Sequence, residues 1–165
     1  MRVLGIDPGT AVMGYGVVEP AQGRAGRLVE CGIVETRAGD RLSLRLRVIH
    51  DAVAALIERH RPQVVAVEAA FYARNVRTTM VLSHARGVIL LAAEEAGVDI
   101  AEYPPAAIKK AIVGRGAALK PQVAFMVQQL LRLKSRPEPA DASDGIAIAL
   151  AHLMAHGRRR VALAR

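Results

Sequence analysis

Two acidic residues each end a short apolar run in this chain. Asp7 follows the run at residues 3–6 and precedes Pro8-Gly9, and Glu68 follows the run at residues 64–67. Short apolar runs are typical of buried strands, and ligands of open α/β sheets bind where parallel strands end. We therefore expect the two carboxylates to meet at one edge of a sheet. Taken alone, Asp7 has an equally ordinary structural role, because Asp before Pro-Gly commonly starts a turn.

A second acidic pair lies near the end of the chain. Asp141 and Asp144 are three residues apart in a segment that we expect to be helical from residue 141 to about 156, so they share one helix face. The alternative is helix capping, because Asp is favoured in a first helical turn. His152 and His156 follow far along the same segment, and we expect both to be solvated.

Four carboxylates in one place repel one another unless cations lie between them. Mg²⁺ and Mn²⁺ prefer oxygen ligands. A pair of such ions ~3.5–4 Å apart activates water and stabilises the leaving oxygen in phosphodiester cleavage. The pattern therefore favours a nuclease with two Mg²⁺ or Mn²⁺ ions per active site, held by Asp7, Glu68, Asp141 and Asp144.

The chain is basic, with a formal net charge of +8. A charge of this size favours an anionic partner, of which nucleic acid is the first candidate and a membrane surface the second. The alternative is that the charge serves solubility. One group of cations lies in and before a glycine-containing loop at residues 114–120, whose amides and cations suit a phosphate: Lys109, Lys110, Arg115 and Lys120.

An aromatic segment follows Glu68 directly. Phe71 and Tyr72 precede Arg74 and Asn75 in a chain that is only 3% aromatic. An aromatic ring beside an acidic site can stack on an unpaired base while an arginine faces a phosphate. The alternative, of about equal weight, is a core phenylalanine at a strand end.

Size and composition indicate one globular domain. The chain has 165 residues, 52% of them hydrophobic, which is enough for a buried core. We expect the domain to cover residues 1–157 and a basic, poorly ordered tail to cover residues 158–165. The single cysteine, Cys31, excludes a disulfide framework or a cysteine zinc site within one chain. No apolar run approaches the ~18 residues of a membrane span, so we expect a cytoplasmic protein without a membrane partner.

The remaining pattern predicts an α/β domain. Strands are expected at residues 3–7, 13–19, 28–35, 64–68 and 98–103, with a loop at 20–27. Helices are expected at residues 41–60, 76–96, 105–113, 122–131 and 141–156. The small residues of the second helix permit close approach of another helix, either from a second copy or within the fold.

Several motifs together resemble one family. They are Gly5-Ile6-Asp7-Pro8-Gly9 with Gly14-Tyr15-Gly16, Val67-Glu68 through Phe71 and Asn75, Ala85-Arg86-Gly87-Val88, Val113-Gly114 to Lys120 with Gln122-Val123, and Asp141-Ala142-Ser143-Asp144-Gly145. In this combination the chain resembles the RuvC family of bacterial Holliday junction endonucleases, within the RNase H-like superfamily. The resemblance runs to about Arg158. Arg74 stands where a lysine is common in the family.

The resemblance implies a fold, an activity and partners. The fold is an α/β RNase H-like fold, a five-stranded mixed sheet whose first three strands are antiparallel, flanked by helices. The activity is metal-dependent resolution of four-way DNA junctions by paired symmetric nicks that leave 5′-phosphate ends, in recombination and repair. The family acts as a homodimer, paired through the helix after Asn75, and works with the RuvA–RuvB branch-migration complex.

The resemblance also implies roles for individual residues. The four metal ligands fall on Asp7, Glu68, Asp141 and Asp144, with Lys120 stabilising developing negative charge. The stacking aromatic falls on Phe71 and the two functional lysines on Lys109 and Lys120. The remaining expected DNA contacts are Tyr72, Arg74, Asn75, Lys110 and Arg115.

Three other functions stay open from the sequence. Asp7-Pro8-Gly9-Thr10 is similar to the phosphate loop of actin-like sugar kinases, but a single domain of this length cannot close around ATP. A non-catalytic junction-binding module would gain nothing from four carboxylates beside phosphate. An RNase H-like nuclease that acts on another nucleic acid would keep the same acids, and substrate competition would distinguish it.

Overall fold

Five strands form one mixed sheet in the computed structural model, which describes residues 1–69 and 76–163. The strands are β1 (Val3–Asp7), β2 (Val12–Ala21), β3 (Arg24–Glu35), β4 (Val64–Glu68) and β5 (Asp99–Tyr103), in the spatial order β3-β2-β1-β4-β5. The first three strands are antiparallel, and β4 and β5 run parallel to β1. This arrangement confirms the predicted α/β class and mixed sheet.

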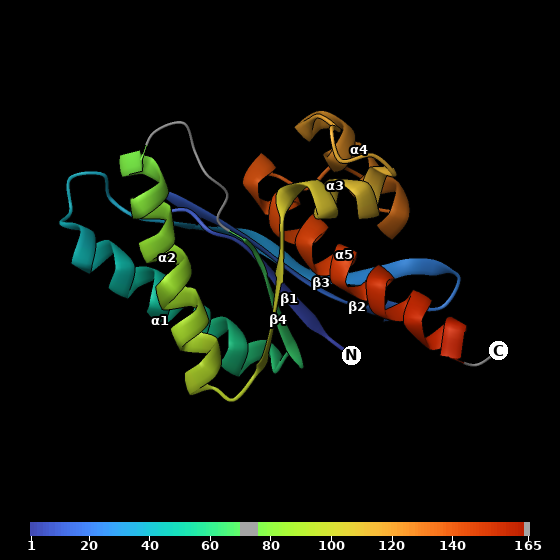
Figure 1. Ribbon diagram of the computed structural model, residues 1–165, viewed down its shortest axis with the longest axis horizontal. Coiled ribbons are helices and arrows are strands. Elements are labelled where there is room, and N and C mark those ends of the chain that lie inside the picture. Colours follow the sequence, from blue (N-terminus) through green and yellow to red (C-terminus); the bar gives the residue numbers. More distant parts are fainter. Residues whose placement is uncertain (70–75, 164–165) are drawn as a thin grey trace.

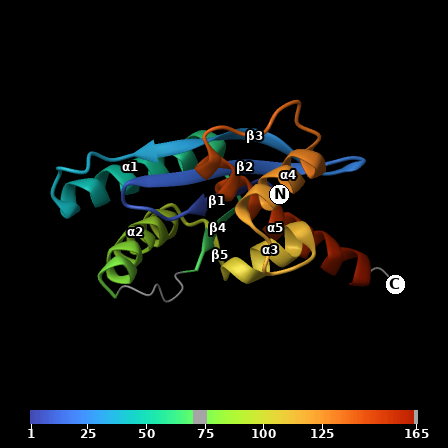
Figure 2. The same ribbon diagram turned by 90° about the horizontal axis from the view of Figure 1, so that it is seen from above.

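Helices cover both faces of this sheet (Figures 1 and 2). One face carries α1 (Leu42–His60) and α2 (Val76–Glu95). The other carries α3 (Pro105–Val113), α4 (Lys120–Leu131) and α5 (Ala140–Leu163). Alternate residues of the central strands point to the two layers: Val3 packs with the α3–α5 layer, whereas Leu4 and Ile6 pack with the α1–α2 layer. Burial on both faces explains why the central strands are continuous apolar runs.

Two element boundaries differ from the sequence prediction. The expected loop at residues 20–27 is mostly strand, because β2 and β3 continue to Ala21 and from Arg24, and Gly23 turns the chain with a φ of +69°. Helix α5 extends to Leu163 instead of ending near His156, so residues 158–163 are helical. A glycine inside a helix costs only ~1 kcal/mol and arginine is a good helix former, so Gly157 did not end the helix.

Two helical histidines are buried, one of which, His152, was expected to be solvated. His60 is 7% exposed and lies 3.2 Å from Glu30. His152 is 2% exposed, and its Nδ1 lies 2.8 Å from the Tyr103 hydroxyl. Position along a helix did not reveal the layer packed against it, which decides burial.

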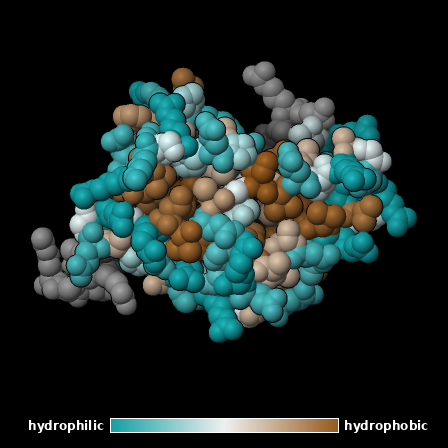
Figure 3. Space-filling view, turned by 180° about the vertical axis from the view of Figure 1, so that it is seen from behind, coloured by the Kyte–Doolittle hydropathy of each residue, from teal (hydrophilic) through white to brown (hydrophobic). Residues whose placement is uncertain are grey.

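The surface is mixed in polarity. Seen from behind, on the side of the edge strand β3, hydrophobic residues gather in two areas within a largely hydrophilic surface (Figure 3). Among the helices of residues 1–69 and 76–163, none is both long and apolar enough to cross a membrane.

Candidate active site

Asp7 and Glu68 end two neighbouring parallel strands. The register pairs Ile6 of β1 with Val67 of β4, so the residues after these two stand side by side at the sheet edge. Both carboxylates line one cavity of about 150 Å³. The two carboxylates therefore lie together at one edge of the sheet, as the sequence predicted.

The start of α5 reaches this edge because glycines let its backbone lie directly on the sheet. Gly14 of β2 is paired with Asp7, and a Cβ built on Gly14 would lie 2.0 Å from the Asp141 carbonyl oxygen. A Cβ on Gly145 would lie 2.5 Å from the Tyr15 Cα. Real Cβ atoms do not approach so closely, so both positions require glycine. This contact brings Asp141 and Asp144 to Asp7.

Three of the four predicted acids converge tightly. Asp7, Asp141 and Asp144 each offer a carboxylate oxygen, and these oxygens lie within 4.8 Å of one another. Glu68 lines the cavity with Asp7 and Asp144 but is outside this closest group. All four donors are oxygens, as hard divalent cations prefer.

The electrostatics of the cluster also suit a cation. Burial, and then the negative charges of Glu68 and Asp144, raise the pKa of Asp7 from 3.8 to about 7, and the positive charge of Lys120 only partly opposes them. Burial, followed by Asp144, raises the pKa of Glu68 as well. Burial and neighbouring negative charges thus both oppose ionisation of these carboxyl groups, which lack enough counter-charge. A divalent ion would supply it.

Lys120 places a positive charge beside the acid cluster. It is the first residue of α4, and its Nζ donates a hydrogen bond of 2.6 Å to Asp144 Oδ2. This contact raises the pKa of Lys120. The Lys120 side chain is 73% exposed and that of Asp144 20%, so the lysine reaches from solvent onto the acid cluster. A second lysine, Lys109 of α3, lines the same cavity, and its positive charge lowers the pKa of Glu68.

The other predicted DNA contacts are less closely placed. Lys110 is exposed and is not among the residues that line the acidic cavity. Arg115 is exposed and donates a 3.2 Å hydrogen bond to the Gln122 side chain near the start of α4. Phe71, Tyr72, Arg74 and Asn75 lie outside the described residues.

A family model decides the relationship: the one described as crossover junction endodeoxyribonuclease RuvC matches residues 3–152. The chain belongs to the RuvC family. A RuvC of Myxococcus xanthus is 49% identical over 162 residues, which cover 98% of this chain and 84% of that protein. A RuvC of Syntrophomonas wolfei is 46% identical over 93% of this chain and 88% of that protein.

Solved structures agree with this assignment. The Thermus thermophilus RuvC structure matches with a TM-score of 0.87 and 38% identity, covering 96% of this chain and 97% of that one. The same protein in complex with a Holliday junction substrate matches with a TM-score of 0.87 and 35% identity, covering 96% of both chains. A yeast mitochondrial Holliday junction resolvase, at 16% identity and a TM-score of 0.66, shares the fold. The predicted RuvC family and RNase H-like fold are thus confirmed.

Sequence reasoning missed a second cavity beside the acids. It lies between α4, α5 and the connecting residues 136–139, and it shares Lys120 and Asp144 with the acidic cavity. Neither Ser143 nor Arg136, which line this cavity, is among the predicted site residues. The proline-rich composition at residues 137–139 was the available signal, but composition does not show what a linker packs beside.

Proposed function

We propose that this chain is a metal-dependent endonuclease that resolves four-way DNA junctions by paired symmetric nicks, leaving 5′-phosphate ends, in recombination and repair. The observation that carries the proposal is the convergence of Asp7, Asp141 and Asp144 within 4.8 Å beside Lys120. A basic chain with an acidic centre suits phosphodiester cleavage, because the cations attract the DNA backbone and the acids hold the metal. The named relatives and the RuvC–junction complex point to the substrate.

The proposed cofactors are two Mg²⁺ or Mn²⁺ ions, held by Asp7, Glu68, Asp141 and Asp144. When bound, such ions supply a deprotonated water and stabilise the leaving oxygen. The remaining chemistry belongs to side chains. Asp7, whose pKa is raised to about 7 in the metal-free protein, would hold a metal in its deprotonated form. Lys120 leaves Asp144 and places its ammonium group against the oxygen that gains negative charge.

The proposed DNA contacts beyond the cleavage site rest on side-chain chemistry and on the resemblance to the family. Lys109 lines the acidic cavity, which supports a contact with the phosphate of a bound DNA strand. Lys110 and Arg115 contact the DNA backbone farther out. Phe71, with Tyr72, Arg74 and Asn75, stacks on and holds unpaired bases near the crossover.

The proposed assembly is a homodimer formed through α2. This helix exposes Val76, Met80 and Leu91, which are 73%, 58% and 50% exposed. Their spacing of four and eleven residues places them along one side of a helix with 3.6 residues per turn. Exposed apolar side chains in one row are typical of an interface. We further propose that the dimer acts in the cytoplasm with the RuvA–RuvB branch-migration complex.

A direct experiment tests the activity. The purified protein is incubated with a labelled synthetic four-way junction and with a linear duplex of equal sequence, in Mg²⁺, Mn²⁺ or EDTA. We expect paired, symmetric nicks in the junction alone, and only with metal. Tight junction binding without nicks in any metal would favour the non-catalytic binding module. Cleavage of another nucleic acid in preference to the junction would favour a different RNase H-like substrate.

A matched pair of variants ties the nicks to the acid cluster. Asp7→Asn should abolish cleavage and spare junction binding, because it removes a metal ligand without a change of size. Asp99→Asn, at the exposed start of β5, removes one charge away from the site and should leave cleavage unchanged. Loss of both binding and cleavage in Asp7→Asn would show that this residue is structural.

A further inference from the structure

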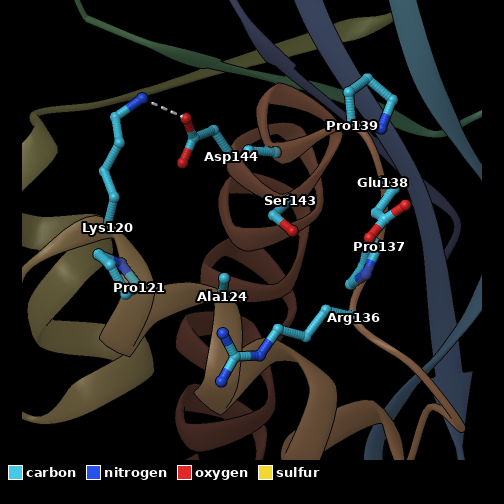
Figure 4. Close-up of a pocket in the computed structure, with 10 residues that line it drawn as sticks. Lys120, Pro121, Ala124, Arg136, Pro137, Glu138, Pro139, Ser143 and Asp144 are labelled. Atoms are coloured by element: carbon cyan, nitrogen blue, oxygen red, sulfur yellow. Dashed lines mark hydrogen bonds and ion pairs between the residues drawn. The ribbon is translucent and has the colours of Figure 1, made fainter.

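The start of α4 determines where the Lys120 ammonium group lies. Lys120 is the first residue of this helix, and its side chain reaches across to Asp144 near the start of α5 (Figure 4). The lysine side chain is 73% exposed, so it has little packing of its own to hold it in place. The contacts that fix the first turn of α4 therefore also fix the lysine against the acid cluster.

This helix begins with a residue that cannot cap it. Leu119 is the N-cap residue of α4, and a leucine side chain has no acceptor for the free N–H groups of a first helical turn. Pro121, the second residue of the helix, has no N–H and so leaves fewer donors to satisfy. The donors that remain need an acceptor from another side chain.

Gln122 supplies this acceptor. Its Oε1 accepts a hydrogen bond of 2.9 Å from the Leu119 N–H. The contact is the part of a capping box that a glutamine at the third helical position provides. The same oxygen accepts a hydrogen bond of 3.2 Å from the Arg115 guanidinium. One atom thus joins the first turn of α4 to the basic loop that precedes it.

The loop at residues 114–119 is anchored at other points as well. Gly114 ends α3 with a φ of +90°, and its N–H donates a hydrogen bond of 2.9 Å to the Lys110 carbonyl oxygen. Ala118 is only 1% exposed. Between these anchors Arg115 is exposed to solvent, and the Gln122 oxygen connects its guanidinium to the helix that carries Lys120.

We propose that Gln122 is a positioning residue for strand cleavage, which acts by holding Lys120 at the acid cluster and Arg115 toward the DNA backbone. The inference rests on the proposed junction nuclease activity. Without the Gln122 oxygen, the Leu119 N–H and the Arg115 guanidinium lose a shared acceptor, and the first turn of α4 loosens. Because a displacement of ~1 Å at a catalytic group lowers a rate by about 100-fold, the loss should appear in the chemical step.

Two substitutions at this position test the role of the acceptor oxygen. Gln122→Met keeps the length of the side chain and removes the acceptor, whereas Gln122→Glu keeps an acceptor that also suits the first turn of a helix. We expect Gln122→Met to lower kcat for junction cleavage by about 10- to 100-fold, and Gln122→Glu to retain most of the wild-type rate. Gln129→Met, the same change at an exposed position of α4, is the matched control and should cleave as wild type does. Urea unfolding in EDTA checks that each variant is folded.

A double-mutant cycle distinguishes positioning of Lys120 from a general loss of structure. In a Lys120→Gln background the group that Gln122 positions is already gone, so Gln122→Met should lower the single-turnover rate by less than about 2-fold. Two independent losses would instead multiply, because their free energies add. The affinity for the uncleaved junction in EDTA should change little in Gln122→Met, because Arg115 and Lys120 keep their charges.

The outcomes separate this inference from the activity on which it rests. If wild type does not cut junctions, the proposed function fails and the role of Gln122 in it fails too. If wild type cuts and Gln122→Met has the same kcat, the positioning role is wrong and the nuclease assignment stands. The same conclusion follows if Gln122→Glu is as slow as Gln122→Met, or if the losses of Gln122→Met and Lys120→Gln multiply.

Discussion

Asp7→Asn should make the metal-free protein more stable while it abolishes cleavage. In the folded chain the pKa of Asp7 is about 7, against 3.8 without the fold. Each pKa unit corresponds to ~1.4 kcal/mol, so the three-unit shift limits the destabilisation at pH 8 to about 4 kcal/mol. Asparagine carries no charge and removes this penalty. Because the neighbouring acids can move apart and reduce part of this penalty in wild type, we expect Asp7→Asn to raise the free energy of unfolding by about 1–4 kcal/mol.

The sign of the pH dependence follows from proton binding. Between pH 4 and pH 7 the folded protein keeps the Asp7 proton that the unfolded chain has lost, so the contribution of Asp7 to wild-type stability falls as pH rises. Above pH 7 the penalty is constant. The stability difference between Asp7→Asn and wild type should therefore be large at pH 8 and smaller at pH 5, as measured by urea unfolding in EDTA.

Magnesium should offset most of this stability difference between Asp7→Asn and wild type. A ligand at 100 times its Kd stabilises a protein by about 2.7 kcal/mol, and we expect that gain for wild type only. If Asp7→Asn is less stable than wild type at pH 8 in EDTA, or if the difference does not shrink at pH 5, the strained carboxylate cluster is refuted. Equal stabilisation of both proteins by Mg²⁺ would place the bound ion away from Asp7.

Three further perturbations follow from the same structure. Gly145→Ala should lower cleavage by at least about 100-fold in a nicking assay, because the new Cβ would displace the start of α5 from Tyr15. A displacement of catalytic groups by ~1 Å is enough for a loss of this size. Gly39→Ala is the control, because a Cβ at Gly39 would meet no atom within 4 Å. Lys120→Gln should lower kcat by about 10²- to 10³-fold while Mg²⁺ still stabilises the fold, and a changed KM with an unchanged kcat would contradict its role in the chemical step. Burial, and then His156, lower the pKa of His152 from 6.5 to about 4, so the unfolded chain binds the extra proton first. The contribution of His152 to wild-type stability should therefore fall by up to about 3 kcal/mol as pH falls from 6.5 to 4. In urea unfolding, His152→Gln should gain stability relative to wild type over this range, and an identical pH profile of the two proteins would contradict the prediction.

Sequence patterns were sufficient for the elements that carry the acids. The continuous apolar runs before Asp7 and Glu68 predicted central strands, and the structure pairs them in parallel at matching register. The spacing of Asp141 and Asp144 predicted their common helix face, and α5 begins at Ala140. Short-range periodicity is enough here because Asp7 and Glu68 end their strands and Asp141 and Asp144 lie within the first five residues of α5.

Packing between elements could not be predicted in the same way. Nothing in the local sequence shows that Gly14 lies under Asp141 or that Gly145 lies on Tyr15, although these contacts bring α5 onto Asp7. His152 shows the same limit, since its burial depends on Tyr103 of a strand that is 49 residues distant in the sequence. Roles for Phe71, Tyr72, Arg74 and Asn75 remain predictions, because they lie outside the described residues.

The position of Lys120 links cation binding to the chemical step. Its ammonium group contacts Asp144 at the boundary between the acidic cavity and the larger one. A cation in the acid cluster would compete with this contact, and the freed lysine would be available to the substrate. Binding of the cation and stabilisation of the developing negative charge would then depend on one side chain. We therefore expect loss of the Lys120 charge to lower the rate of cleavage more strongly than the affinity for the junction.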